Sequence, residues 1–110
     1  MVVGTTLMKL NGDPYYSPQF SRGGLSAVFS VTVEQLAGSG FTFDIDVEHR
    51  NADDTAWTSA GTFATINSPG TYTHDISAIK EQVRFKYTVG GSAATAAVHF
   101  LMTAPSWRPY

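Results

Sequence analysis

A strict alternation of apolar and polar residues, sustained over two long runs, is the feature that most limits how this chain can fold. In both runs the odd-numbered positions are apolar: Leu25, Ala27, Phe29, Val31 and Val33, and then Phe41, Phe43, Ile45 and Val47. A period of two places alternate side chains on opposite faces of a strand, whereas a helix repeats every 3.6 residues. Each run therefore predicts a half-buried strand. The Gly-Ser-Gly sequence at 38–40 predicts a turn that pairs the two strands as a β-hairpin.

Further runs of the same kind follow along the chain. They predict a weaker strand at 55–66, interrupted at Gly61, and three clearer strands at 71–77, 83–89 and 96–102. Turn-forming residues separate them at 67–70 (NSPG) and 90–92 (GGS), and a seventh strand is expected within 5–10. Residues 78–81 are expected to form a single helical turn, and no segment predicts a longer helix.

A chain of 110 residues has the length of one domain, and residues 1–110 are expected to form one. The strand spacing predicts an all-β fold: an antiparallel β-sandwich, jelly-roll-like, with about seven or eight strands and no long helix. The inward apolar side chains of the strands form the predicted core: Phe29, Val31, Phe43, Ile45, Val47, Phe85, Tyr87, Val98 and Phe100.

Two segments near the ends of the chain, 11–24 (NGDPYYSPQFSRGG) and 103–110 (TAPSWRPY), do not alternate and are rich in proline, glycine and aromatic residues. Proline has no amide donor, so these irregular segments are expected to be extended arms and not central strands. Their aromatic rings must pack onto the sandwich or dock on a neighbouring chain. We predict the second, with protein-interface residues Tyr15, Tyr16, Phe20, Trp107 and Tyr110.

Composition excludes several classes of function. The net charge is −2 with no basic block, which argues against nucleic-acid binding. No run approaches the roughly 18 apolar residues of a membrane span, and no signal-peptide pattern is visible at the N-terminus. There are no cysteines for a disulfide or a Cys-based zinc site. Charged residues make up only 15% of the chain, so its surface is easily desolvated and suits burial against a partner.

Three acids, Asp44, Asp46 and Glu48, alternate along the outward face of one predicted strand, about 6.5–7 Å apart. They could form a cation site or a carboxylate pair for acid–base chemistry. Arg84 and Lys86 show the same alternation on another strand, so a ladder of opposite charges is the favoured interpretation. The oxygen-rich segment 51–54 (NADD) lacks the glycine and later glutamate of an EF-hand loop, and is interpreted as a polar hairpin loop.

The residues for catalysis are scattered. His49, His74 and His99 form no HxH or HxxxH pair, cysteine is absent, and no GxSxG elbow is present. Nothing selects a triad of His74, Asp75 and a distant serine, and His49 is expected to be structural. We therefore predict no catalytic, cofactor-binding or metal-binding residues and no cofactor, although a small β-barrel enzyme stays a third alternative.

The segment 47–89 contains VEHRNADDTAWTSAGTF, an SPG turn and VRFKYTV. Residues Asp53, Asp54, Thr55, Trp57, Gly61, Phe63, Arg84 and Lys86 carry a resemblance to small β-sandwich domains of bacteriophage virion proteins. The resemblance covers about 40% of the chain and implies a structural role by analogy.

We therefore expect a non-enzymatic structural protein of a phage-like virion: a capsid decoration or cement protein, or another accessory head or tail protein. It would be made in the host cytoplasm and located in the virion. Its expected partners are proteins, through self-association as a homo-oligomer or contact with the capsid shell, without nucleic acid or membrane. The alternative is a carbohydrate- or cell-surface-binding β-sandwich module. Such modules stack sugar rings on exposed aromatic residues, whereas the place of Trp57 early in a strand fits a core or an edge position equally well.

Overall fold

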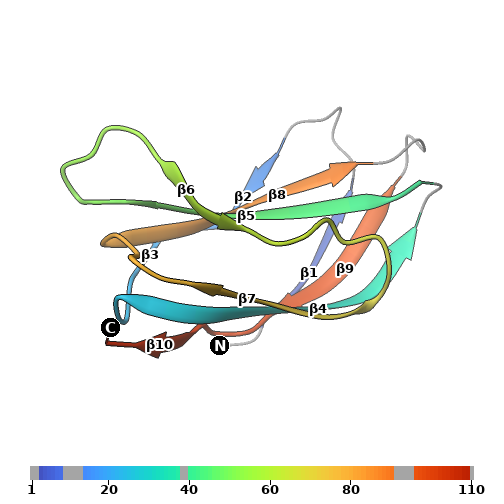
Figure 1. Ribbon diagram of the computed structural model, residues 1–110. Helices are drawn as coiled ribbons and strands as arrows, with labels where there is room; N and C mark the ends of the chain where they lie inside the picture. Colours follow the sequence, from blue (N-terminus) through green and yellow to red (C-terminus); the bar gives the residue numbers. More distant parts are fainter. Residues whose placement is uncertain (1–2, 9–13, 38–39, 91–95, 110) are drawn as a thin grey trace.

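A computed structural model describes residues 3–8, 14–37, 40–90 and 96–109, and within these ranges it contains only strands and loops. The strands are β1 (Val3–Met8), β2 (Tyr15–Tyr16), β3 (Phe20–Ser21), β4 (Ser26–Ala37), β5 (Thr42–Arg50), β6 (Thr58–Thr62), β7 (Gly70–Ile76), β8 (Gln82–Gly90), β9 (Ala97–Met102) and β10 (Ser106–Arg108). They form two antiparallel sheets that face each other, as Figure 1 shows. The predicted all-β sandwich is confirmed.

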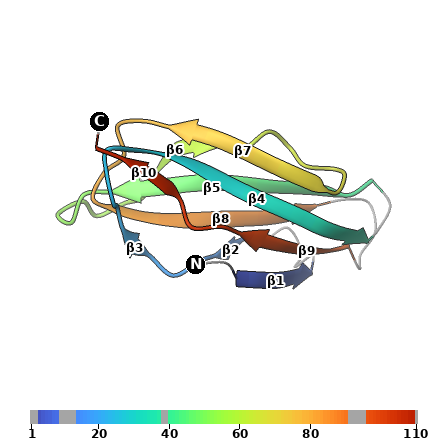
Figure 2. The same ribbon diagram turned by 90° about the horizontal axis from the view of Figure 1, so that it is seen from below.

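Each sheet contains a strand that is assembled from two pieces. Strands β9 and β10 both pair with the same edge of β4, and β7 pairs with the other edge (Figure 2). In the same way, β2 and β3 share one edge of β8, whose other edge pairs with β5. If β2–β3 and β9–β10 are each counted as one interrupted strand, the ten elements make eight strands. Their order is then 1-8-3-6 in one sheet and 2-7-4-5 in the other, which is the jelly-roll order.

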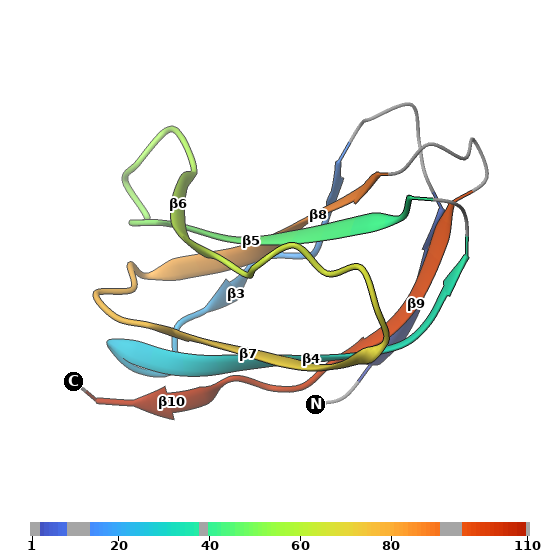
Figure 3. The same cartoon turned by 45° about the vertical axis from the view of Figure 1, so that its right-hand side comes forward.

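The predicted hairpin between the two most regular runs is wrong. Strand β4 pairs with β7, β9 and β10, whereas β5 pairs with β6 and β8, so the chain changes sheet between them. Figure 3 shows the two strands in separate layers. Alternation tells which face of a strand is buried, and both runs bury their odd positions against one shared core. It does not tell which neighbouring strand receives the backbone hydrogen bonds.

The core lies between the sheets, and all nine core residues predicted from the alternation are buried, from 0% exposed for Phe29 to 8% for Tyr87. An aromatic cluster occupies its centre, where the rings of Phe43 and Phe100 are 4.9 Å apart and those of Tyr87 and Phe100 are 5.1 Å apart. Leu25 precedes β4 and is exposed, although it shares the parity of the core residues. Most of the hydrophobic stabilisation of the domain comes from this shared interior.

Three expectations about local structure need correction. Residues 78–81 form no helical turn: Ala78 has a φ of 55°, and the amide of Ile79 donates to the carbonyl of Leu25 at 3.0 Å. This bond ties the loop to the segment before β4. Strand β6 is shorter than the expected 55–66: it begins at Thr58, continues through Gly61 and ends at Thr62. The first strand begins at Val3, two residues before the expected range 5–10, and residues 9 and 10 lie outside the described residues.

The two aromatic segments contribute short strands to the sheets. Segment 11–24 contains β2 and β3 on the free edge of β8, and segment 103–110 contains β10 on β4. The amide of Ser17 and the carbonyl of Phe85 are hydrogen-bonded at 2.9 Å between β2 and β3. Pro18 lies between β2 and β3, and Pro105 lies between β9 and β10, where no ladder amide is required. The extended conformation was expected, but the pairing within the chain's own sheets was not.

Candidate interaction surface

The outer face of the sheet β2-β8-β5-β6 carries a network of polar and charged side chains that contact one another. Because β5 and β8 bury their odd-numbered residues, their even-numbered side chains point outward in register. Four rows cross these strands: Asp44 opposite Thr88, Asp46 opposite Lys86, Glu48 opposite Arg84, and Arg50 opposite Gln82. The two middle rows therefore pair an acid with a base, as the sequence predicted.

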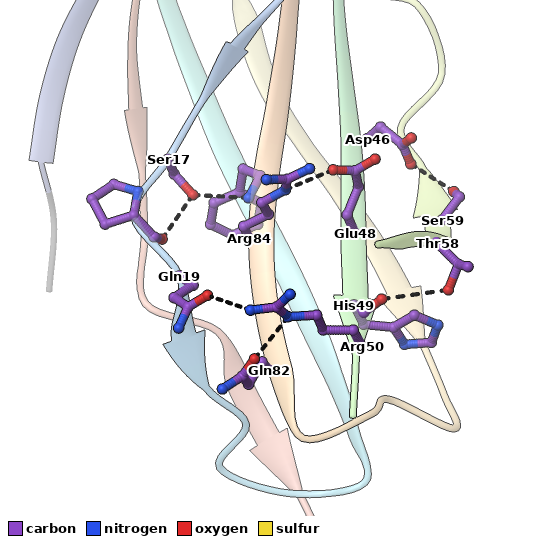
Figure 4. Close-up of polar contacts among 12 residues, drawn as sticks. Ser17, Gln19, Asp46, Glu48, His49, Arg50, Thr58, Ser59, Gln82 and Arg84 are labelled. Atoms are coloured by element: carbon purple, nitrogen blue, oxygen red, sulfur yellow. Dashed lines mark hydrogen bonds and ion pairs between the residues drawn. The ribbon is translucent and has the colours of Figure 1, made fainter. Parts of the chain in front are cut away.

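Arg84 is held on three sides. Its Nε donates to Glu48 Oε1 at 2.8 Å, and its guanidinium carbon lies 4.2 Å from the ring centroid of Tyr16 and 4.6 Å from that of Trp57. Figure 4 shows the ion pair across β8 and β5. Both partners are partly covered, since the side chain of Glu48 is 13% exposed and that of Arg84 is 25% exposed. Partial burial and ring stacking fix the guanidinium more firmly than an isolated surface ion pair would.

Arg50 lies beside this pair and interacts with neutral groups. Its guanidinium carbon is 4.6 Å from the centroid of the Trp57 ring, so Trp57 contacts both arginines. Its Nε donates to Gln82 Oε1 at 2.9 Å, and its terminal nitrogen donates to Gln19 Oε1 at 3.4 Å (Figure 4). The positive charge of Arg50 is thus positioned by amides. We call Tyr16, Trp57, Arg50 and Arg84 the arginine–aromatic face.

The acids at the other end of this sheet face bind hydroxyl groups. Asp46 Oδ1 accepts hydrogen bonds from Ser59 at 2.6 Å and Thr62 at 3.2 Å, and Asp44 Oδ1 accepts one from Thr65 at 2.7 Å. The predicted ladder is therefore confirmed as an ion pair for Glu48 and Arg84. For Asp46 and Lys86, the predicted position of the acid opposite the base on the neighbouring strand is confirmed. Within the described ranges, no three His, Cys, Asp or Glu side chains are grouped as a metal site.

The loop after β5 is built around a buried histidine. His49 is 9% exposed, and its Nδ1 accepts a hydrogen bond from the amide of Lys80 at 3.1 Å. Burial and the nearby Lys80 ammonium lower the pKa of His49, against an opposing effect of Asp54. The amide of Asn51 donates to Asp54 Oδ2 at 2.8 Å and closes the turn. The structural role predicted for His49 and the polar loop predicted for 51–54 are both confirmed.

The other histidines occupy separate places. His74 packs against the ring of Phe63, with centroids 5.7 Å apart, whereas the neighbouring Asp75 points to the opposite side of β7 and pairs with Arg108. This pair therefore cannot act together as base and orienting acid. His99 Nε2 lies 3.3 Å from Glu34 Oε1, and both residues belong to the sheet that contains β4 and β9.

The predicted interface aromatics fall into two groups. Tyr16 is 50% exposed and belongs to the arginine–aromatic face. Tyr15, Phe20 and Trp107 are partly buried and pack against the domain's own core, and Tyr110 lies outside the described residues. Neither Trp57 nor Arg50 was among the predicted interface residues. The signal for Arg50 was its even-numbered position at the end of β5, which places its side chain outward in the row next to that of Glu48 and Arg84.

Comparison with known proteins adds no further constraint: no family model, no curated protein and no solved structure matches this chain. The described part of the chain also contains no helix with the length and apolar character needed to span a membrane.

Proposed function

We propose that this chain is a non-enzymatic structural protein of a phage-like particle, a capsid decoration or cement protein or another accessory head or tail protein. It would act through protein–protein contacts and be located in the virion after synthesis in the host cytoplasm. The arginine–aromatic face is the observation that carries the proposal. Arginine, tryptophan and tyrosine are the residue types most enriched at the energetic centres of protein interfaces.

The geometry of this face favours binding. Arg84 is held by Glu48, Tyr16 and Trp57, so little side-chain freedom is left to lose when a partner docks. Arg50 keeps its charge without an acid among its described hydrogen-bond partners and offers a site for a partner's carboxylate. The jelly roll supports the proposal by analogy, because viral capsid domains often adopt it.

Quantitative mass spectrometry of particles from the source of this gene tests the proposal. Particles should be purified on a density gradient and compared with the soluble fraction of the same lysate. We expect the chain to co-sediment with the particles in a fixed ratio to the shell protein. A chain that stays entirely in the soluble fraction while particles form would refute a virion role.

A carbohydrate-binding module is the second candidate, because Tyr16 and Trp57 lie on one sheet face and jelly rolls include lectin domains. In the present arrangement the Arg84 guanidinium lies over both rings and competes with a sugar for them. A glycan array with the intact protein and the Trp57→Ala variant separates the two candidates. We expect no glycan to be retained. Retention that Trp57→Ala abolishes would favour the lectin function.

A further inference from the structure

The charges on the outer face of the sheet β2-β8-β5-β6 are sorted by strand. The charged outward residues of β5 before Arg50 are acidic: Asp44, Asp46 and Glu48. The charged outward residues of β8 are basic: Arg84 and Lys86. An acidic column therefore runs beside a basic column, about 4.8 Å away, which is the distance between neighbouring strands.

Such a pair of columns is complementary to itself. A two-fold axis that runs parallel to the strands, midway between β5 and β8, exchanges the acidic column for the basic one. The height of each row along the axis is unchanged by this rotation. Asp46 of one copy then faces Lys86 of the second copy, and Glu48 faces Arg84 of the second copy. This is the isologous contact expected of a two-fold dimer.

We propose that this sheet face binds a second copy of the same chain, related by a two-fold axis parallel to β5 and β8. The proposal rests on the assembly function above and identifies the partner of that surface. A two-fold axis perpendicular to the strands would instead place Asp46 on Glu48 and Arg84 on Lys86. Like charges would meet in that orientation, so the charge pattern selects the parallel axis.

The available area sets the expected strength of the dimer. The nine residues of β5 extend over about 30 Å, and the strands across the sheet span about 19 Å. Two such faces bury at most roughly 1,100 Å² in total, which lies at the low end for specific complexes. The dimer should therefore be weak and concentration-dependent in solution. It should also weaken with added salt, because salt screens the attraction between the facing charges.

The outer face of the other sheet offers no comparable pattern. Strand β4 and its edge partner β7 present Ser30 opposite Thr73 and Thr32 opposite Thr71, and the two threonine hydroxyls bond to each other at 3.1 Å. These neutral hydroxyl rows give no charge complementarity that would choose an orientation. That face therefore supplies a control surface for the experiment.

Charge reversal in two variants tests the dimer. Asp46→Lys places two bases in the row that Asp46 shares with Lys86, and Lys86→Asp places two acids in that row. We expect each variant alone to self-associate about tenfold or more weakly than the wild type, because like charges now face each other. An equimolar mixture of the two variants should recover association, since the basic row of one variant meets the acidic row of the other. Sedimentation velocity over a concentration series measures all three samples.

Two controls separate binding from folding. Glu34→Lys produces the same charge change as Asp46→Lys but on the other sheet, and it should leave association unchanged. Thermal melts of each variant monitor the fold, and mixing cannot repair an unfolded domain. A wild type that remains monomeric at every concentration would overturn the dimer, as would a mixture that associates no better than either variant. A monomer that is still present in purified particles would leave the proposed virion function standing.

Discussion

Trp107→Ala tests whether the aromatic residue near the end of the chain stabilises the domain itself. Trp107 pairs with Ala27 of β4, and its ring meets the ring of Phe29 edge-on, with centroids 6.0 Å apart. Complete burial of a large aromatic residue is worth about 3–5 kcal/mol on truncation to alanine. Trp107 is only partly buried, so we expect a loss of about 2 kcal/mol. The domain should remain folded and melt roughly 10 °C lower.

Gly23 provides a partner for a double-mutant cycle. A Cβ atom at Gly23 would lie 2.7–2.9 Å from atoms of the Trp107 ring, which must then shift. Gly23→Ala should therefore cost about 1–3 kcal/mol in the wild type and much less in the Trp107→Ala background. Urea denaturation followed by circular dichroism gives the four free energies of unfolding. Tyr16→Ala is the matched control on an exposed aromatic residue and should cost less than about 1 kcal/mol. Additive effects at Gly23 and Trp107, or a loss below about 0.5 kcal/mol for Trp107→Ala, would show that the ring does not dock on the core in solution.

Three further outcomes follow from the core, the histidine and the acidic column. Phe43→Ala removes a fully buried ring from the aromatic centre and should lower the free energy of unfolding by about 3–5 kcal/mol in urea titrations. A loss below about 1 kcal/mol would show that the inward face of β5 is assigned wrongly. Because His49 has a lowered pKa in the folded state, the unfolded chain binds its proton more readily. The contribution of neutral His49 to the free energy of unfolding should be complete above about pH 6.5 and should be lost as pH falls through the folded-state pKa. Thermal melts of His49→Asn should show a smaller loss of stability over the same pH range. Calcium should leave the melting temperature unchanged, since hydroxyl groups already bind Asp44 and Asp46; a rise that a chelator reverses would replace this picture with a metal site.

The period-two pattern predicted burial more accurately than it predicted pairing. All nine residues that it predicted for the core are buried, because a sandwich buries one face of each strand whatever the strand order. It could not separate β4 from β5, which alternate equally well and lie in different sheets. Pairing depends on contacts between distant segments, such as β4 with β9 and β5 with β8, and a single sequence does not encode these in any local signal.

Two features of the surface could not be predicted from the sequence: the very short strands, and the stacking of an aromatic ring on side chains distant in the sequence. Strands β2, β3 and β10 contain two or three residues each, too few for alternation to become visible, and proline hides them further. The charge rows of β5 and β8 were predicted because both strands are long and regular. The stacking of Trp57 on Arg50 and Arg84 was not, since Trp57 reaches them from a loop before β6.

The order in which strands are made bears on how this domain folds in a cell. Strand β8 lies between β5 and the β2–β3 edge, and β9 lies between β1 and β4, so the inner strands of both sheets include segments that leave the ribosome late. Until they emerge, β1, β4 and β5 lack their central partners and expose unpaired backbone. Sheets built from such distant segments fold slowly, because long loops must close before contacts form. We therefore expect the nascent domain to be open to association through its unpaired edges until β8 and β9 have emerged.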